Sequence, residues 1–156
     1  MTTDRPATAG ARRPVIQVAA AAMGGLFLLV GVLGFVPGIV TEYDEMKLAG
    51  HESGAELLGL FQVSILHNAV HLLFGVAGLA LARTVAGARA FLLGGGTVYA
   101  VLWIYGLLIE HDSGANFVPL NDADNWLHLA LAAVMVALGL ALAPQRQPGA
   151  APPTNA

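Results

Sequence analysis

The feature that most limits how this chain can fold is a set of four apolar stretches, each close to the length that crosses a bilayer. They cover about residues 15–36, 60–82, 88–109 and 126–143. A helix needs about 20 apolar residues to cross the hydrocarbon core, and only helices and closed barrels satisfy their own backbone in lipid. Because the stretches are continuous and do not alternate, they exclude a strand barrel. We therefore predict an all-α fold, an integral membrane four-helix bundle.

The composition supports this class and excludes several others. Charged residues make up 11% of the 156 residues, whereas soluble domains carry about a quarter. The lipid bilayer is therefore the expected partner. The chain has no cysteine, which excludes disulfides, zinc–thiolate sites and cysteine nucleophiles. The basic residues are scattered and form no basic face, so no nucleic-acid partner is expected.

Charges divide between the two ends of the predicted helices. Six of the seven basic residues fall on one side, and they are Arg5, Arg12, Arg13, Arg83, Arg89 and Arg146. Nine of the ten acidic residues fall on the other. Because Lys and Arg are retained on the cytoplasmic side, both termini are expected to be cytoplasmic. Residues 1–14 and 144–156 are predicted to be disordered cytoplasmic tails, which leaves residues 15–143 as the transmembrane domain.

Two similar motifs place polar side chains inside the predicted spans. Both read [H/D]-N-x-x-H, and the six polar residues involved are His67, Asn68, His71, Asp124, Asn125 and His128. The two end positions of each motif are four residues apart and share a helix face. Ionisable side chains at this depth normally face the bundle interior and have partners. We expect the six side chains to form a polar intramembrane cluster near the outer end of the bundle.

A second repeated sequence, the tripeptide Phe-Val-Pro, precedes each of these motifs. Phe-Val-Pro follows the first span at residues 35–37 and the third span at residues 117–119. Repeated outward-then-inward pairs of helices occur in proteins built from parallel repeats. The chain is therefore hypothesised to contain two parallel hairpin repeats.

Three interpretations of the polar cluster stay open. In the first, His and Asn side chains hydrogen-bond across helices and only fix the packing, as in a structural or accessory protein. In the second, a redox or metal-binding module uses His67, His71 and His128 to hold Zn, Cu or haem. In the third, the cluster lines a path for protons or small molecules, because His titrates near neutrality. No nucleophile–base pair or phosphate-binding loop is visible, so we assign no catalytic residue and expect no enzyme.

Three segments resemble the DUF4383 family, a group of small bacterial four-helix membrane proteins of unknown function. They are LFQVSILHNAVHLLFGVAGLALAR, YAVLWIYGL and FVPLNDADNWLHLALAAVMVALGL. The resemblance covers about residues 59–142 and includes both His/Asn motifs. It implies a multi-pass protein of the bacterial plasma (inner) membrane and supplies no activity. A second copy of the chain or another membrane protein is the remaining expected partner.

Overall fold

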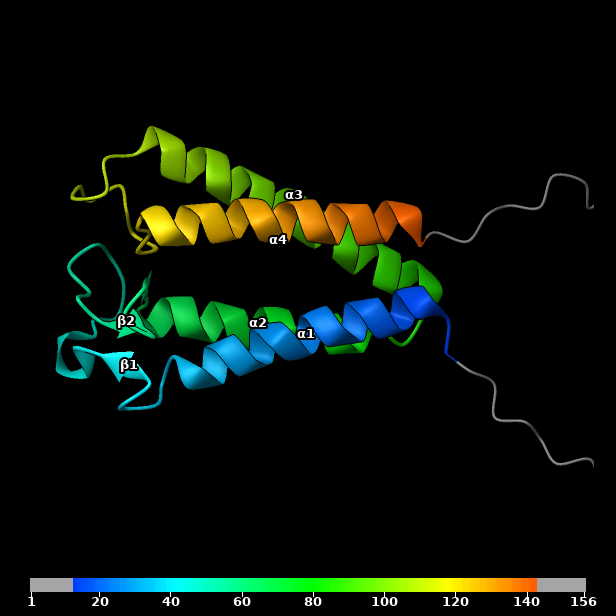
Figure 1. Cartoon of the computed structure of the whole chain (residues 1–156), viewed down its shortest axis with the longest axis horizontal. Helices are drawn as coiled ribbons and strands as arrows, with labels where there is room; N and C mark the ends of the chain where they lie inside the picture. Colours follow the sequence, from blue (N-terminus) through cyan, green and yellow to red (C-terminus); the bar gives the residue numbers. More distant parts are fainter. Residues whose placement is uncertain (1–12, 143–156) are drawn as a thin grey trace, which may run out of the picture.

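The computed structural model describes residues 13–142 and consists of four helices that form two antiparallel hairpins (Figure 1). The helices are α1 (Val15–Leu33), α2 (Ile65–Leu81), α3 (Val85–Leu108) and α4 (Asp122–Ala141). The first hairpin joins α1 to α2, and the second joins α3 to α4, with contacts between the hairpins made mainly through α3. The predicted all-α four-helix architecture is confirmed. The predicted tails, 1–14 and 144–156, lie almost wholly outside the described residues.

Three of the helices, α1, α3 and α4, are long and apolar enough to cross a membrane. The shorter α2 is also apolar and has 17 residues, which gives a length of about 26 Å at about 1.5 Å per residue. This length is at the lower limit for a span. The sequence had predicted a longer stretch over residues 60–82.

The start of α2 explains the difference. Ser64 is the N-cap, and its hydroxyl accepts a hydrogen bond from the backbone N–H of His67 at 3.1 Å. The residues just before it cannot extend the helix because Phe61 and Gln62 pair as a strand. Asn121 begins α4 in a similar way, within a capping box that it shares with Asp124. Ser and Asn are favoured at this position because their side chains satisfy a free backbone N–H.

A small antiparallel sheet lies in the α1–α2 connection, residues 34–64, and the sequence analysis missed it. Its strands are β1 (Val40–Thr41), β2 (Glu56–Leu57) and β3 (Phe61–Gln62), in the order β1-β2-β3. A 3₁₀ turn, η1 (Tyr43–Glu45), follows β1. Strands of two residues give no alternating hydrophobic pattern that a sequence could reveal. The sheet is held by its own small core, which contains Val40, Ala55, Leu57 and Val63.

Glycines allow close packing within each hairpin. A Cβ added at Gly24 would lie 2.9 Å from the backbone nitrogen of Leu79, and one at Gly75 would lie 2.8 Å from the carbonyl oxygen of Gly24. In the second hairpin, a Cβ at Gly96 would lie 2.7 Å from a methyl carbon of Val136. Small residues at helix interfaces bring backbones together where lipid provides no hydrophobic drive for association.

The two ends of the bundle differ in charge. Residues 13 and 142 and the short α2–α3 turn lie at one end, whereas the sheet and the α3–α4 connection, residues 109–121, lie at the other (Figure 1). Arg13, Arg83 and Arg89 therefore belong to the first end. The acidic residues of the two long connections belong to the second, which we call the outer end after the orientation that the sequence predicts.

Candidate functional site

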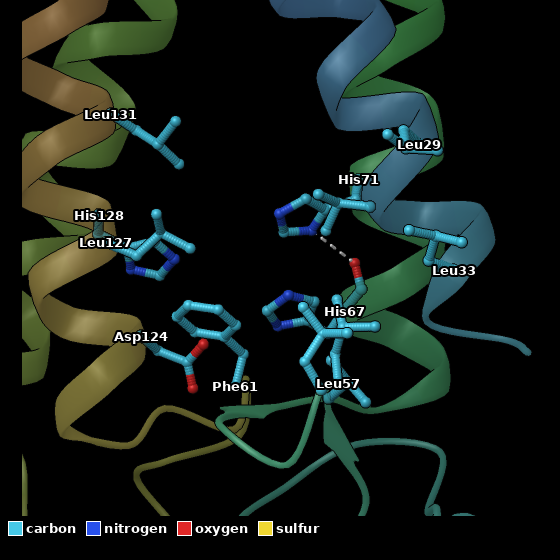
Figure 2. A pocket seen from close by; sticks show the side chains of 13 residues that line it. Leu29, Leu33, Leu57, Phe61, His67, His71, Asp124, Leu127, His128 and Leu131 are labelled. Atoms are coloured by element: carbon cyan, nitrogen blue, oxygen red, sulfur yellow. Dashed lines mark hydrogen bonds between the residues drawn. The ribbon is translucent and has the colours of Figure 1, made fainter. Parts of the chain in front are cut away.

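Four of the six predicted cluster residues line one cavity between the hairpins, which we call the imidazole cavity. His67 and His71 lie on its α2 side, and Asp124 and His128 lie on its α4 side (Figure 2). The cavity has a volume of about 130 Å³. Its remaining walls are apolar and include Phe61 below the imidazoles.

The two predicted asparagines face elsewhere. Asn68 is fully buried and donates from Nδ2 to the carbonyl oxygen of Gly34 at 2.6 Å. Asn125 packs against Gly106 so closely that a Cβ on this glycine would collide with the Asn125 Oδ1. Each asparagine follows its cavity-lining neighbour by one residue and is turned by about 100° around the helix. Each therefore points into its own hairpin instead of the space between the hairpins.

The imidazoles of α2 form an ordered pair. The rings of His67 and His71 stack with centroids 4.4 Å apart and an interplanar angle of 8°. Nδ1 of His71 lies 3.1 Å from the carbonyl oxygen of His67 (Figure 2). Because a carbonyl only accepts hydrogen bonds, Nδ1 of His71 carries the proton. Nε2 of neutral His71 is then an acceptor, and it lies 3.5 Å from the hydroxyl of Tyr99.

His67 and His128 are buried but carry a ring nitrogen without a partner. His67 is 6% exposed and His128 is 3% exposed. Nδ1 of each ring has no hydrogen-bond partner among the described residues. Buried polar groups normally have partners, so each exception requires an explanation.

Asp124 acts on the backbone and not on an imidazole. Its Oδ2 accepts hydrogen bonds from the backbone N–H of Asn121 at 3.1 Å and of Gln62 at 3.0 Å. The second bond joins α4 to β3, 62 residues away in the sequence. No hydrogen bond or ion pair within residues 13–142 joins Asp124 to a histidine. The carboxylate therefore fastens the outer end of α4 to the sheet.

Aromatic side chains connect the cavity to the centre of the bundle. Phe27 of α1 and Tyr99 of α3 stack with centroids 5.3 Å apart and an interplanar angle of 4°. Phe27 lies edge-on to His71 at 5.9 Å, and the Tyr99 ring lies 5.2 Å from that of His128. Each hairpin thus contributes at least one aromatic ring and one histidine to the same contact region.

The residues that the sequence analysis missed are of two kinds. Phe27 carried a signal, because it lies on the small-residue face of α1 with Gly24 and Gly31. Phe61 and Gln62 carried none, since their place depends on a strand pairing that no local pattern encodes.

No group of three or more His, Asp and Glu side chains in residues 13–142 is arranged so that it could hold a metal ion. The proposed set His67, His71 and His128 thus draws no support from side-chain geometry. The metal or haem alternative stays a prediction.

The family model described as "Domain of unknown function (DUF4383)" matches residues 17–141. The chain belongs to the DUF4383 family. The resemblance seen in the sequence is thereby confirmed, and the DUF4383 model covers α2, α3, α4 and all but the first two residues of α1. No curated protein and no solved structure matches the chain. The function of this DUF4383 protein must therefore be argued from its own side chains.

Proposed function

We propose that this chain is a multi-pass protein of the bacterial plasma membrane with a structural or accessory role, and that both its termini are cytoplasmic. The apolar helices and the DUF4383 membership support the membrane assignment. The arginines at the end opposite the sheet support the orientation, because Lys and Arg mark the cytoplasmic side. The sheet and both long connections then face the outside.

The observation that carries the structural role is the use made of the polar groups. Asn68 joins α2 to the end of α1, and Asp124 joins α4 to β3. Asn121 adds a third link by donating from Nδ2 to the carbonyl oxygen of Leu60 at 2.9 Å. Hydrogen bonds between membrane helices average about 0.6 kcal/mol, and they also fix the helix register. Three such links at one end hold the outer parts of both hairpins in place.

The two hairpins also have matching contacts, which support a parallel repeat. Asn68 packs on Gly34 as Asn125 packs on Gly106. His71 and His128 each follow the asparagine by three residues. The aromatic partners Phe27 and Tyr99 each follow a packing glycine, Gly24 or Gly96, by three residues. In proteins built from such repeats the functional region lies where the repeats meet.

Reporter fusions test the orientation. An enzyme that is active only outside the cytoplasm, fused after residue 142, should be inactive, and the same enzyme inserted at Gly114 should be active. The insertion site lies in the α3–α4 connection, where Gly114 is exposed and an added Cβ would have no neighbour within 4 Å. Activity of the C-terminal fusion would overturn the proposed topology.

Analysis of the purified protein separates the structural role from the metal alternative. We expect colourless protein without bound Zn, Cu or haem, and lower thermal stability in an Asp124→Ala variant. A Soret band, or near-stoichiometric metal that is lost in His71→Ala, would instead establish a cofactor site.

A further inference from the structure

Two further cavities share lining residues with the imidazole cavity. A second cavity of about 210 Å³ shares His67, His71 and His128 with it and extends to Tyr99. A third of about 220 Å³ shares Phe61 and His71 and extends to Phe27. His71 lines all three. At about 10–15 Å³ per enclosed water, even the smallest has room for a ring of several atoms.

These cavities reach the surface that faces lipid. Leu26 lines the third cavity and is 42% exposed, and Val70 and Val98 line the second and are each 48% exposed. All three lie within the predicted spans, on apolar helix faces. A molecule dissolved in the bilayer could therefore enter between the hairpins without passing through water.

The polar groups of the cavity favour an uncharged ligand. The lining of the three cavities includes one carboxylate, Asp124, and no Lys or Arg. A lipid phosphate or a fatty-acid carboxylate would enter without a compensating cation and would face this carboxylate. The site is therefore unsuited to an anionic headgroup.

The histidines favour a ligand with oxygen atoms at opposite ends. His67 and His128 lie on opposite walls, and the described residues hold no hydrogen bond to Nδ1 of either ring. Since no such bond fixes the tautomer, the N–H can occupy whichever ring nitrogen meets a ligand. Each ring can thus donate to a carbonyl oxygen, or accept from a hydroxyl through its other nitrogen.

The aromatic side chains favour a flat ligand. Phe27, Phe61 and Tyr99 are among the residues that line these cavities. A planar ring can stack on or meet the edge of such side chains, a contact worth about 0.5–1.5 kcal/mol beyond burial. A flat apolar ring with an oxygen at each end is a para-quinone.

We propose that these cavities bind the ring of a lipid-soluble para-quinone, with its two oxygens held by His67 and His128 from opposite walls. The apolar tail of such a molecule runs out past Val70, Val98 or Leu26 into the bilayer. The same imidazoles can hold the hydroquinone, because each offers both a donor and an acceptor. The proposal is independent of the orientation and of the structural links argued above.

Calorimetric titration of the full chain in detergent micelles tests the proposal. Menadione supplies the quinone ring, and methylnaphthalene supplies the same ring system without carbonyl oxygens. We expect saturable binding of menadione and at least about 10-fold weaker binding of methylnaphthalene, as the loss of two hydrogen bonds implies. Equal affinity for the two probes, or no saturable binding of menadione, would overturn the proposal.

Variants locate the site. His128→Ala should weaken menadione binding about 5–10-fold and leave methylnaphthalene binding unchanged, whereas His128→Gln, which retains a donor, should keep most of the affinity. His51→Ala is the matched control, because His51 lies in the α1–α2 connection away from the cavities. Equal menadione affinity in His128→Ala and His51→Ala would refute the assignment. If His128→Ala does not fold, the same comparison is made with His67→Ala, and the two-probe titration of the unaltered chain still decides.

Discussion

Two adjacent glycines of α1 provide a sharp test of how the first hairpin is held together. A Cβ at Gly24 would lie 2.9–3.0 Å from backbone atoms of Gly75, Gly78 and Leu79, whereas one at Gly25 would have no neighbour within 4 Å. Ordinary contacts of a Cβ begin at 3.4 Å. The backbones of α1 and α2 would therefore have to separate by roughly half an ångström to admit a methyl group at Gly24.

The expected free energies follow from this geometry. Alanine improves on glycine within a helix by about 0.5–1 kcal/mol, so Gly25→Ala should slightly stabilise the protein. Gly24→Ala gains the same amount but incurs an overpacking penalty of about 1–3 kcal/mol, because backbone atoms cannot move aside as a side chain can. The two variants should differ by this penalty, with Gly24→Ala the less stable.

Reversible unfolding in mixed micelles, with SDS as the denaturant and helical circular dichroism as the signal, measures this difference. Both variants alter the same residue type in the same helix, so changes in insertion or detergent binding are matched. If Gly24→Ala proves as stable as Gly25→Ala, the close approach of α1 to α2 is not what holds the hairpin.

Three further predictions concern the outer end and the aromatic contact. Asp124→Ala removes the acceptor of two backbone N–H groups and should destabilise the protein by about 1–3 kcal/mol, with faster amide hydrogen exchange at Gln62. Leu58 has a φ of 58°, in the left-handed region that disfavours residues with a side chain by about 1–2 kcal/mol. Leu58→Gly should therefore raise the melting temperature. A lower melting temperature in this variant would mean that the side-chain contacts of Leu58 outweigh the backbone strain. Tyr99→Phe retains the stacked ring and loses only a long 3.5 Å contact with His71, so its unfolding free energy should change by less than about 0.5 kcal/mol. Tyr99→Ala should lose about 3–5 kcal/mol, and equal losses in the two variants would show that the hydroxyl, not the ring, matters.

The helices could be predicted because their signal is local. Each apolar stretch is continuous, and length alone assigns it to a helix in lipid. The two [H/D]-N-x-x-H motifs also contain the four polar side chains that line the cavity between the hairpins, since residues four apart share a face whatever the partner helix is. The asparagines were placed in the same cluster, but the single-residue offset turns Asn68 and Asn125 away from it.

The outer end could not be predicted because its contacts are distant in the sequence. The bond from Gln62 to Asp124 closes a loop of 62 residues, and neither residue type is distinctive at its position. The sequence analysis placed Asp124 in one cluster with the imidazoles, and a carboxylate that orients a histidine is the common arrangement at metal sites. The capping box explains the actual outcome, because a carboxylate in the first turn of a helix is already close to unsatisfied backbone N–H groups.

The links between the α1–α2 connection and the second hairpin also set the order in which the molecule can be completed during synthesis. The strand residue Gln62 leaves the ribosome long before Asp124, and Gly50, whose backbone N–H bonds to the carbonyl oxygen of Phe117, waits slightly longer for its partner. Contacts this distant form late, after local ones. In the membrane topology proposed above, the first hairpin therefore waits in the bilayer, without its contacts to the second hairpin, until the α3–α4 connection and the start of α4 have been translated.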